Sequence, residues 1–534
     1  MKKRKKIILG SITGALALAL AGGGFWAYKT FVPQETPIDK NATVASNFYQ
    51  AVNKDWLLKT KIPADSPSID NFYTLDEDIK GKLKKDIKNL GEGKETSDIT
   101  GMSEFITFYK AASDYKQREK DGLEPLKPYL KEIEDIKDLN DLASKSASLT
   151  DKGIPLPFGY DVGTNAENTS QKQIQLSPPS ILLPDVSIYK DEASKKQYLT
   201  PIETATQKAL EMLGYSEKNS KRIVKEALEF DEIIAKYSLS NEEMSESKNL
   251  VHPKTAEEIN AYSGSFKLYD VIKGIMGRDL ETINVPNTKY FENYSKIVNQ
   301  DNFSKIKSWI LVQEAMAASN SLTEDYRLNF QSISMAIMGT QKPVSKEDTV
   351  YEMSVHLFSD VMSVYYGRKY FGEEAKTDVT GMIDKIKNVY RGRLQKNNWL
   401  TESTRNKAIE KLDKMKVFVG YQEDVNPGTK ELHLDPNKSF FELSEDIAQF
   451  GKRYTIDHFD DPIDKNKWSG SAFDINAYYN PESNSINFPA GILQAPFYDK
   501  NQSTEKNYGG IGVVIGHEIT HAFDSNGADY DENG

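Results

Sequence analysis

The chain has 534 residues, 38% of them hydrophobic and 28% charged, which is enough for two or three globular domains. Its formal net charge is −11, and its basic residues are dispersed apart from one N-terminal run, so we expect no nucleic-acid partner. The absence of cysteine excludes disulfides, thiolate catalysis and a cysteine-type zinc site.

The N-terminus has the pattern of a membrane anchor. A basic run over residues 2–6 precedes an uncharged stretch over residues 7–28. As a helix this stretch would reach roughly 33 Å, enough to cross the hydrocarbon core of a bilayer. We therefore predict a cytoplasmic tail over residues 1–6, a transmembrane signal anchor over residues 7–28 and a tether over residues 29–45. The rest of this single-pass protein would lie outside the cell membrane.

A cleaved signal peptide is the alternative for the same stretch. Ala17-Leu18-Ala19 and Ala19-Leu20-Ala21 both resemble small-residue cleavage sites. Cleavage at either would give a secreted protein.

The pattern after the tether is mainly helical. Residues 77–90 are amphipathic, as are residues 375–395 and 402–415. Thr200, Pro201 and Glu203 predict a helix that begins at Thr200 with a capping box and runs to Met212. Residues 171–176 alternate as in a short strand.

A β-hairpin is predicted near the C-terminal end. Residues 472–479 are rich in β-favouring side chains, residues 480–485 supply turn residues, and residues 486–488 resume an apolar strand pattern. An edge strand of this kind can bind an extended peptide by main-chain pairing.

The strongest functional signal is His517-Glu518-Ile519-Thr520-His521. On a helix the two histidines lie one turn apart on one face, with Cβ atoms about 5–6 Å apart. Two imidazoles so placed can hold one Zn²⁺ at roughly 2.0–2.1 Å each. Glu518 would then stand beside the metal as a general base that takes a proton from the attacking water.

The alternative for this motif is a helix with two solvated histidines. Its apolar flanks predict instead that the helix is buried, and two buried histidines require a partner such as a metal. Gly516 predicts a close backbone neighbour beside the first histidine. The remaining four histidines have no companion at metal spacing and are expected to be structural or exposed: His252, His356, His433 and His458.

Long motifs around the metal helix resemble one family. They cover Ile475 to Pro481, Phe488 to Phe497, Asn507 to Gly512, and the metal helix through to Gly527. Weaker matches are Asn47 to Trp56, Trp399-Leu400, Thr404-Arg405, Lys411-Leu412 and Gly420-Tyr421. With these motifs the chain resembles the neprilysin-like zinc metallopeptidases, which include bacterial oligopeptidases of the endopeptidase O type and membrane-anchored animal enzymes.

The resemblance implies a mainly α fold with a small β component (α+β), in which a large helical domain and a thermolysin-like catalytic domain enclose a chamber. Residues 46–235 would form the N-terminal, catalytic-side part and residues 236–435 the helical domain. Residues 436–534 would carry the edge strand and the zinc helix of a catalytic domain that is incomplete here.

The resemblance also implies residue roles. His517 and His521 would bind one Zn²⁺ per chain and Glu518 would be the general base, with oligopeptides as substrates. Asn476 and Ala477 would hold the substrate main chain in an extended pose. The pocket just after the scissile bond would be lined by Ile492, Phe497, Val513 and Val514, joined by Phe72. Simple core packing is the alternative for these five residues.

Two departures from the family pattern affect these expectations. Ser68 and Asp76 stand where the animal enzymes carry arginines that grip a substrate's C-terminal end, so the resemblance does not by itself imply a preference for releasing C-terminal dipeptides. The family's third zinc ligand is a glutamate some tens of residues beyond the second histidine, and the sequence has none there. Asp524 could serve as a second-shell partner of His521, with a solvated or capping role as the alternative.

The sequence therefore predicts the N-terminal part of a membrane-anchored zinc endopeptidase acting on oligopeptides outside the cytoplasm. The rival hypothesis is an inactive fragment or pseudopeptidase that binds peptides or surfaces, because two protein ligands should hold zinc weakly.

Overall fold

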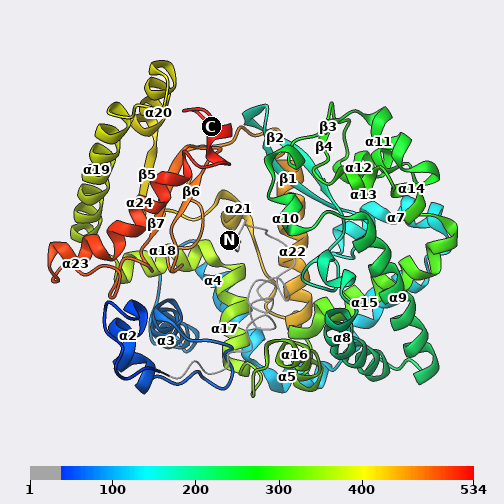
Figure 1. The fold of residues 1–534 in the computed structure, drawn as a ribbon. Coiled ribbons are helices and arrows are strands. Elements are labelled where there is room, and N and C mark those ends of the chain that lie inside the picture. Colours follow the sequence, from blue (N-terminus) through cyan, green and yellow to red (C-terminus); the bar gives the residue numbers. More distant parts are fainter. Residues whose placement is uncertain (1–37) are drawn as a thin grey trace.

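The computed structural model describes residues 38–534 (Figure 1). Helices dominate and strands are few, which confirms the prediction of a mainly α fold with a small β component. Within residues 38–534 every helix is too short or too polar to cross a bilayer. The predicted tail over residues 1–6, the predicted anchor over residues 7–28 and the first part of the tether lie outside the described residues.

The largest hydrophobic core, which we call the large core, is built mainly from the segment between residues 126 and 337, with Phe441 and Ile456 added from a later helix. Residue 235, where the first predicted part of the chain ends, lies in α9 near its C-terminal end. The helices from residue 115 to residue 338 are α5 Tyr115–Asp121, α6 Lys127–Glu134, α7 Leu139–Asp151, α8 Glu192–Met212, α9 Glu217–Tyr237, α10 Asn241–Met244, α11 Ala256–Tyr262, α12 Leu268–Met276, α13 Thr288–Phe291, α14 Tyr294–Ile297, α15 Phe303–Ala317 and α16 Glu324–Met338.

A four-stranded sheet lies against the large core. Its strands are β1 Gly159–Asn165, β2 Asn168–Ser177, β3 Pro253–Lys254 and β4 Ile283–Asn284, in the order β1-β2-β4-β3. β1 and β2 are antiparallel, and β2 contains the strand predicted over residues 171–176. Ile174 and Leu176 of β2 are buried in the core, which is why the alternation was visible in the sequence.

The predicted start of a helix at Thr200 is wrong. α8 begins eight residues earlier, after Asp191, whose side chain accepts a hydrogen bond from the Ser194 N–H at 2.7 Å. Pro201 lies inside the helix, although proline removes one main-chain hydrogen bond. Tyr198 and Ile202 are both buried on the same face, so packing holds the helix together across the proline.

The second hydrophobic core, which we call the middle core, shares the helix α22 Phe440–Asp457 with the large core. Its helices include α3 Asn71–Gly91, α4 Met102–Ser113, α17 Lys346–Leu357 and α18 Ser359–Tyr370, and α3 confirms the helix predicted over residues 77–90. The shared helix α22 stands between the left and right halves of the molecule in Figure 1 and has residues in both the large and the middle core. Nearby are α2 Phe48–Lys59 and α21 Pro427–Glu431.

The third core, which we call the metal-helix core, positions the predicted site. Its elements are α19 Glu373–Gln395, α20 Glu402–Lys414, β5 Lys416–Gly420, β6 Tyr478–Asn480, β7 Ser485–Pro489, α23 Thr504–Gly509 and α24 Ile511–His521. The helices predicted over residues 375–395 and 402–415 are confirmed. So is the hairpin, although its first strand begins only at Tyr478.

The three-stranded sheet of this core has the order β5-β7-β6. β7 is central and buried along its whole length, parallel to β5 and antiparallel to β6. β6 is therefore an edge strand, and it lies beside α24 in Figure 1.

The remaining regular elements are short 3₁₀ helices. They are η2 Glu124–Leu126, η3 Val186–Lys190, η4 Ser247–Asn249, η5 Gly264–Phe266, η6 Gln300–Asn302, η7 Ala318–Asn320 and η8 Gly527–Asp529.

Candidate metal centre

A glycine allows α24 to begin where it does. A Cβ atom at Gly510 would lie 2.3 Å from the main-chain oxygen of Phe497, so only glycine permits this approach. The same oxygen accepts a hydrogen bond from the Ile511 N–H at 2.8 Å, which satisfies one of the free donors at the helix start. The close neighbour predicted beside His517 is wrong, because a Cβ at Gly516 would meet nothing within 4 Å.

α24 is buried on one face only. Ile511, Ile515 and Ile519 are fully buried against β7 and α19. The opposite face is open, with Val513 64% exposed, and His517 is also exposed. The prediction of two buried histidines is therefore wrong for this chain: the apolar residues at helical spacing cover one side of the helix, while the histidines project from another.

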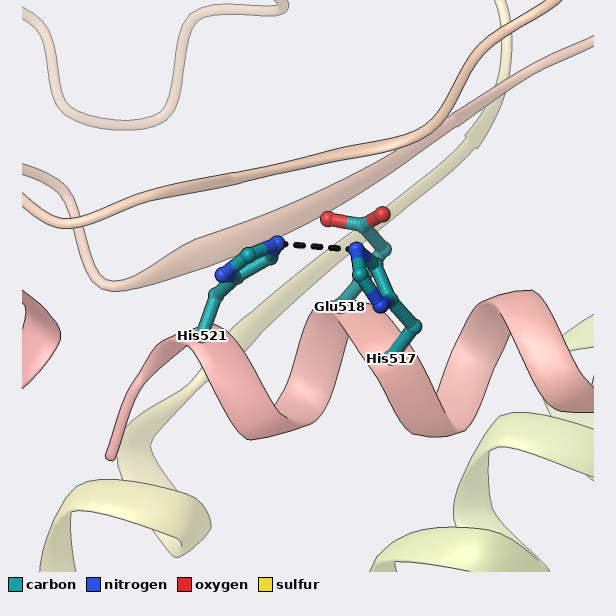
Figure 2. Close-up of side chains that lie close together, drawn as sticks. All are labelled: His517, Glu518 and His521. Carbon is teal, nitrogen blue, oxygen red and sulfur yellow. Dashed lines mark hydrogen bonds between the residues drawn. The ribbon is translucent and has the colours of Figure 1, made fainter. Parts of the chain in front are cut away.

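His517 and His521 converge through their Nε2 atoms, which lie 3.0 Å apart (Figure 2). Two nitrogens bound to one tetrahedral zinc ion are about 3.3 Å apart, so small rotations of the rings would admit the ion. The potential ligand atoms of His517, Glu518 and His521 all lie within 4.8 Å of one another. The donor set present here therefore fits zinc.

Glu518 is buried and faces the edge strand. It is 4% exposed, and the main-chain N–H of Tyr479 in β6 donates a hydrogen bond to its carboxylate. Burial raises the pKa of Glu518 to about 7, although His521 and the Tyr479 N–H oppose the shift. A carboxyl with this pKa can both accept and release a proton near neutral pH.

The contact from Tyr479 was not predicted from the sequence. Its donor is a main-chain N–H, so the residue type gives no signal, and only the position of Tyr479 in the motif Ile475 to Pro481 pointed toward it.

Asp524 lies on the far side of His521 from the convergent nitrogens. Its Oδ2 is 2.8 Å from His521 Nδ1, while Oδ1 accepts the main-chain N–H groups of Asn526 at 3.0 Å and Gly527 at 2.8 Å. A carboxylate at Nδ1 favours the tautomer whose Nε2 lone pair is free for a metal. Asp524 thus has both of the roles that the sequence left open: it supports His521 and it caps the loop that follows.

Phe72 and Phe497 meet although they are distant in the sequence. Phe72 comes from α3, and its ring centroid lies 4.8 Å from that of Phe497. Val514 is half-buried beside the metal-helix core and its neighbour Val513 is exposed. Ile492 is different: only 1% of it is exposed, so its side chain packs in the core.

The two residues predicted to hold the substrate main chain stand just before β6. Asn476 is exposed and Ala477 is 6% exposed, with the Ala477 N–H donating to Asn476 Oδ1 at 2.9 Å. Their place at the start of the edge strand puts them in the same short segment as Tyr479, which contacts Glu518.

No other metal-type cluster occurs in residues 38–534. The group His517, Glu518 and His521 alone has imidazole and carboxylate ligand atoms close enough to share an ion in that part of the chain. His458 stacks on Tyr454 with ring centroids 3.9 Å apart. His433 is 85% exposed.

The positions expected to differ from the animal enzymes are both exposed. Asp76 follows Phe72 by one turn of α3, and Ser68 precedes that helix. Neither supplies a positive charge.

Comparisons with known proteins show which proteins this chain is similar to. Two family models, both described as Peptidase family M13, match residues 44–422 and 476–534. The neutral endopeptidase of Lactobacillus helveticus is 35% identical over 497 residues, which are 93% of this chain and 77% of that protein. A neutral endopeptidase of Lactococcus lactis subsp. lactis is 33% identical, over 92% of this chain and 78% of that protein.

Solved structures show the same fold. The crystal structure of PepO from Lactobacillus rhamnosis HN001 matches with a TM-score of 0.88 at 27% identity, covering 92% of this chain and 78% of that one. The zinc metalloprotease Zmp1 of Mycobacterium tuberculosis, solved with an inhibitor, matches with a TM-score of 0.84 at 23% identity, over 93% of this chain and 75% of that one.

Proposed function

Because the chain belongs to peptidase family M13, we propose that it acts as a zinc endopeptidase on oligopeptides, with Glu518 as the general base. The observation that carries the proposal is the convergence of the His517 and His521 Nε2 atoms beside a buried Glu518 whose carboxylate meets the edge strand. Metal ligands, a proton acceptor and a strand that can pair with a peptide then lie together.

His517 and His521 would hold the zinc ion through Nε2, and Asp524 would keep His521 in the required tautomer. When bound, zinc supplies a Lewis acid for the scissile carbonyl and lowers the pKa of water.

Glu518 moves the proton. Its carboxylate accepts a proton from water as the water oxygen bonds to the carbonyl carbon of the substrate. The same carboxyl then returns that proton to the leaving amine as the C–N bond breaks.

The substrate would lie extended beside the segment that starts at Asn476. β6 is an edge strand whose Tyr479 N–H already contacts Glu518, so an additional strand would lie along the segment that precedes it, at Asn476 and Ala477. The side chain just after the scissile bond would contact the paired rings of Phe72 and Phe497. This arrangement favours apolar residues at that substrate position.

The test combines zinc titration with cleavage of a quenched fluorescent peptide library. We expect the purified chain to bind one zinc ion and to cut peptides, and Glu518→Gln to bind zinc equally but to lose hydrolysis by at least about 10²-fold. Undiminished turnover by Glu518→Gln would reject the assignment of the base.

Peptide binding without hydrolysis is the second candidate function. It is favoured by the metal group itself, which among the described residues contains two imidazoles and only Glu518 as a carboxylate. Weak zinc binding and no cleavage, together with retention of library peptides on the immobilised chain, would support this candidate over the peptidase.

We also propose that the peptidase part lies outside the cell membrane, held by residues 7–28. The support is the sequence pattern alone: a basic run followed by an uncharged stretch. Fractionation of cells and N-terminal sequencing of the product would distinguish an anchored chain from a secreted one.

A further inference from the structure

We propose that Lys411 is a positioning residue for the metal centre: it holds the loop after α24 so that Asp524 stays against His521. The inference rests on the proposed function in one respect, the role of His521 as a metal ligand. It adds a residue from a different helix, more than a hundred positions earlier in the chain.

Lys411 is a nearly buried lysine on α20. Only 5% of it is exposed, and its Nζ donates hydrogen bonds to the main-chain oxygens of Gly527 and Tyr530, each at 2.6 Å. These two carbonyls belong to the segment that follows the metal helix. A buried ammonium that donates to two carbonyls fixes that segment more firmly than a neutral donor would.

Gly527 is connected to the metal ligand His521 through Asp524. The N–H of Gly527 donates to Asp524 Oδ1 at 2.8 Å, and Asp524 Oδ2 lies 2.8 Å from His521 Nδ1. Gly527 therefore contacts both partners: its carbonyl accepts a hydrogen bond from Lys411, and its N–H donates to the Asp524 carboxylate.

The loop also packs closely on the end of α24. A Cβ atom at Gly527 would lie 1.9 Å from the main-chain oxygen of His521, so the loop can take this position only with glycine there. Any relaxation of the loop would move the Gly527 N–H away from Asp524.

The surroundings of Lys411 act on its charge in opposite directions, and their net effect is to lower its pKa. Burial lowers the pKa of Lys411, whereas the nearby carboxylates of Asp524 and Asp531 act in the opposite direction. The ammonium also lies 5.9 Å from the centroid of the Tyr479 ring, and the main-chain N–H of Tyr479 donates to Glu518. Lys411 thus lies between the two segments that contact Glu518 and His521.

A purely structural anchor is the competing explanation, and the tautomer of His521 separates the two. In ¹⁵N-histidine-labelled full-length chain at one pH above the histidine titration range, we expect His521 to carry its proton on Nδ1. Lys411→Met and Asp524→Ala should both shift His521 toward the Nε2–H tautomer, and Lys411→Arg should restore the Nδ1–H form.

Lys414→Met is the matched control. Lys414 lies one turn away on the same helix, half exposed, and reaches the C-terminal segment only through an ion pair with Glu532 at 3.4 Å. It should leave the tautomer unchanged. An Nδ1–H form that persists in Lys411→Met would overturn the proposal, as would its absence from the unmodified chain.

A second variant and a measurement of zinc affinity complete the test. If Lys411→Met does not fold, Gly527→Ala disrupts the other end of the link with Lys411 in place, and an unchanged tautomer there would also overturn the proposal. In the folded variants, zinc affinity is measured by competition with a chromophoric chelator, and it should fall about tenfold in Lys411→Met. The double variant Lys411→Met/Asp524→Ala should bind zinc no more weakly than Asp524→Ala alone. Because the tautomer is read without zinc or substrate, loss of the proposed peptidase activity would not by itself decide this inference.

Discussion

The Nδ1 atom of His521 and the Oδ2 atom of Asp524 lie 2.8 Å apart, within three residues of each other at the end of α24. The pair leaves the Nε2 atom of His521 facing that of His517. A residue that touches no metal in this arrangement thus determines which nitrogen is free to bind one.

Asp524→Ala is therefore expected to weaken zinc binding about 10- to 100-fold, the usual effect of removing a carboxylate behind a metal-bound histidine. Competition with a chromophoric chelator measures the change. Asp529→Ala, at an exposed position in the same loop, is the control and should have no effect. Equal affinities for the two variants would refute the role of Asp524.

Phe72→Ala should impair cleavage rather than folding. Phe72 is 46% exposed, so its removal costs little core packing, but its ring forms one side of the pair with Phe497. We expect kcat/KM to fall about tenfold for peptides with a large apolar residue after the scissile bond, and much less for those with alanine there. Trp399→Ala, which removes an aromatic ring that is 78% exposed, is the control. A uniform loss over all peptides would contradict the assignment.

Two glycines near the metal helix should respond in opposite directions to alanine. Gly510→Ala places a methyl group 2.3 Å from the Phe497 oxygen and should destabilise the fold by about 2 kcal/mol or more. Gly516→Ala meets open space inside the helix and should stabilise it by up to about 1 kcal/mol. Urea unfolding monitored by circular dichroism gives both values, and a stabilising Gly510→Ala would show that the close approach is not required.

A buried carboxyl far from the metal centre should make stability depend on pH. Burial, aided by Glu445, raises the pKa of Glu314 to about 8, while Lys452 acts against the shift. The folded chain therefore holds a proton that the unfolded chain releases above its ordinary pKa near 4.5. Stability from this group is present below about pH 4.5 and is lost as the pH rises to about 8, at about 1.4 kcal/mol per unit of pKa shift.

Glu314→Gln should consequently raise the melting temperature at pH 8 and change it little at pH 5. Thermal unfolding at the two pH values measures this, with Glu257→Gln, at an exposed position, as the control. A stabilisation of the same size at both pH values would mean that the effect is packing and not titration.

The sequence predicted those features that depend on short spacing. The pair His517 and His521, the hairpin before it and the helices around residues 77–90 and 375–395 all follow from local patterns of residue type. α8 shows the limit of this reasoning. Thr200 and Pro201 have the residue types of a helix start, but buried neighbours on both sides continue the helix through them.

Features that depend on distant contacts were beyond prediction from the sequence. Gly510 is required by the oxygen of Phe497, and Lys411 contacts carbonyls of a loop 116 and 119 positions later. The burial of the metal helix was overestimated for a related reason: an apolar segment predicts contact with a neighbour, but only the fold decides which face is covered.

The bridging helix α22 has a consequence for how the molecule unfolds. Phe440 and Phe441 are adjacent in the chain, yet the first packs in the middle core and the second in the large core. Neither core can lose this helix without exposing apolar side chains of the other. We therefore expect one cooperative transition over both cores, in which partly unfolded molecules with only one of them intact are rare.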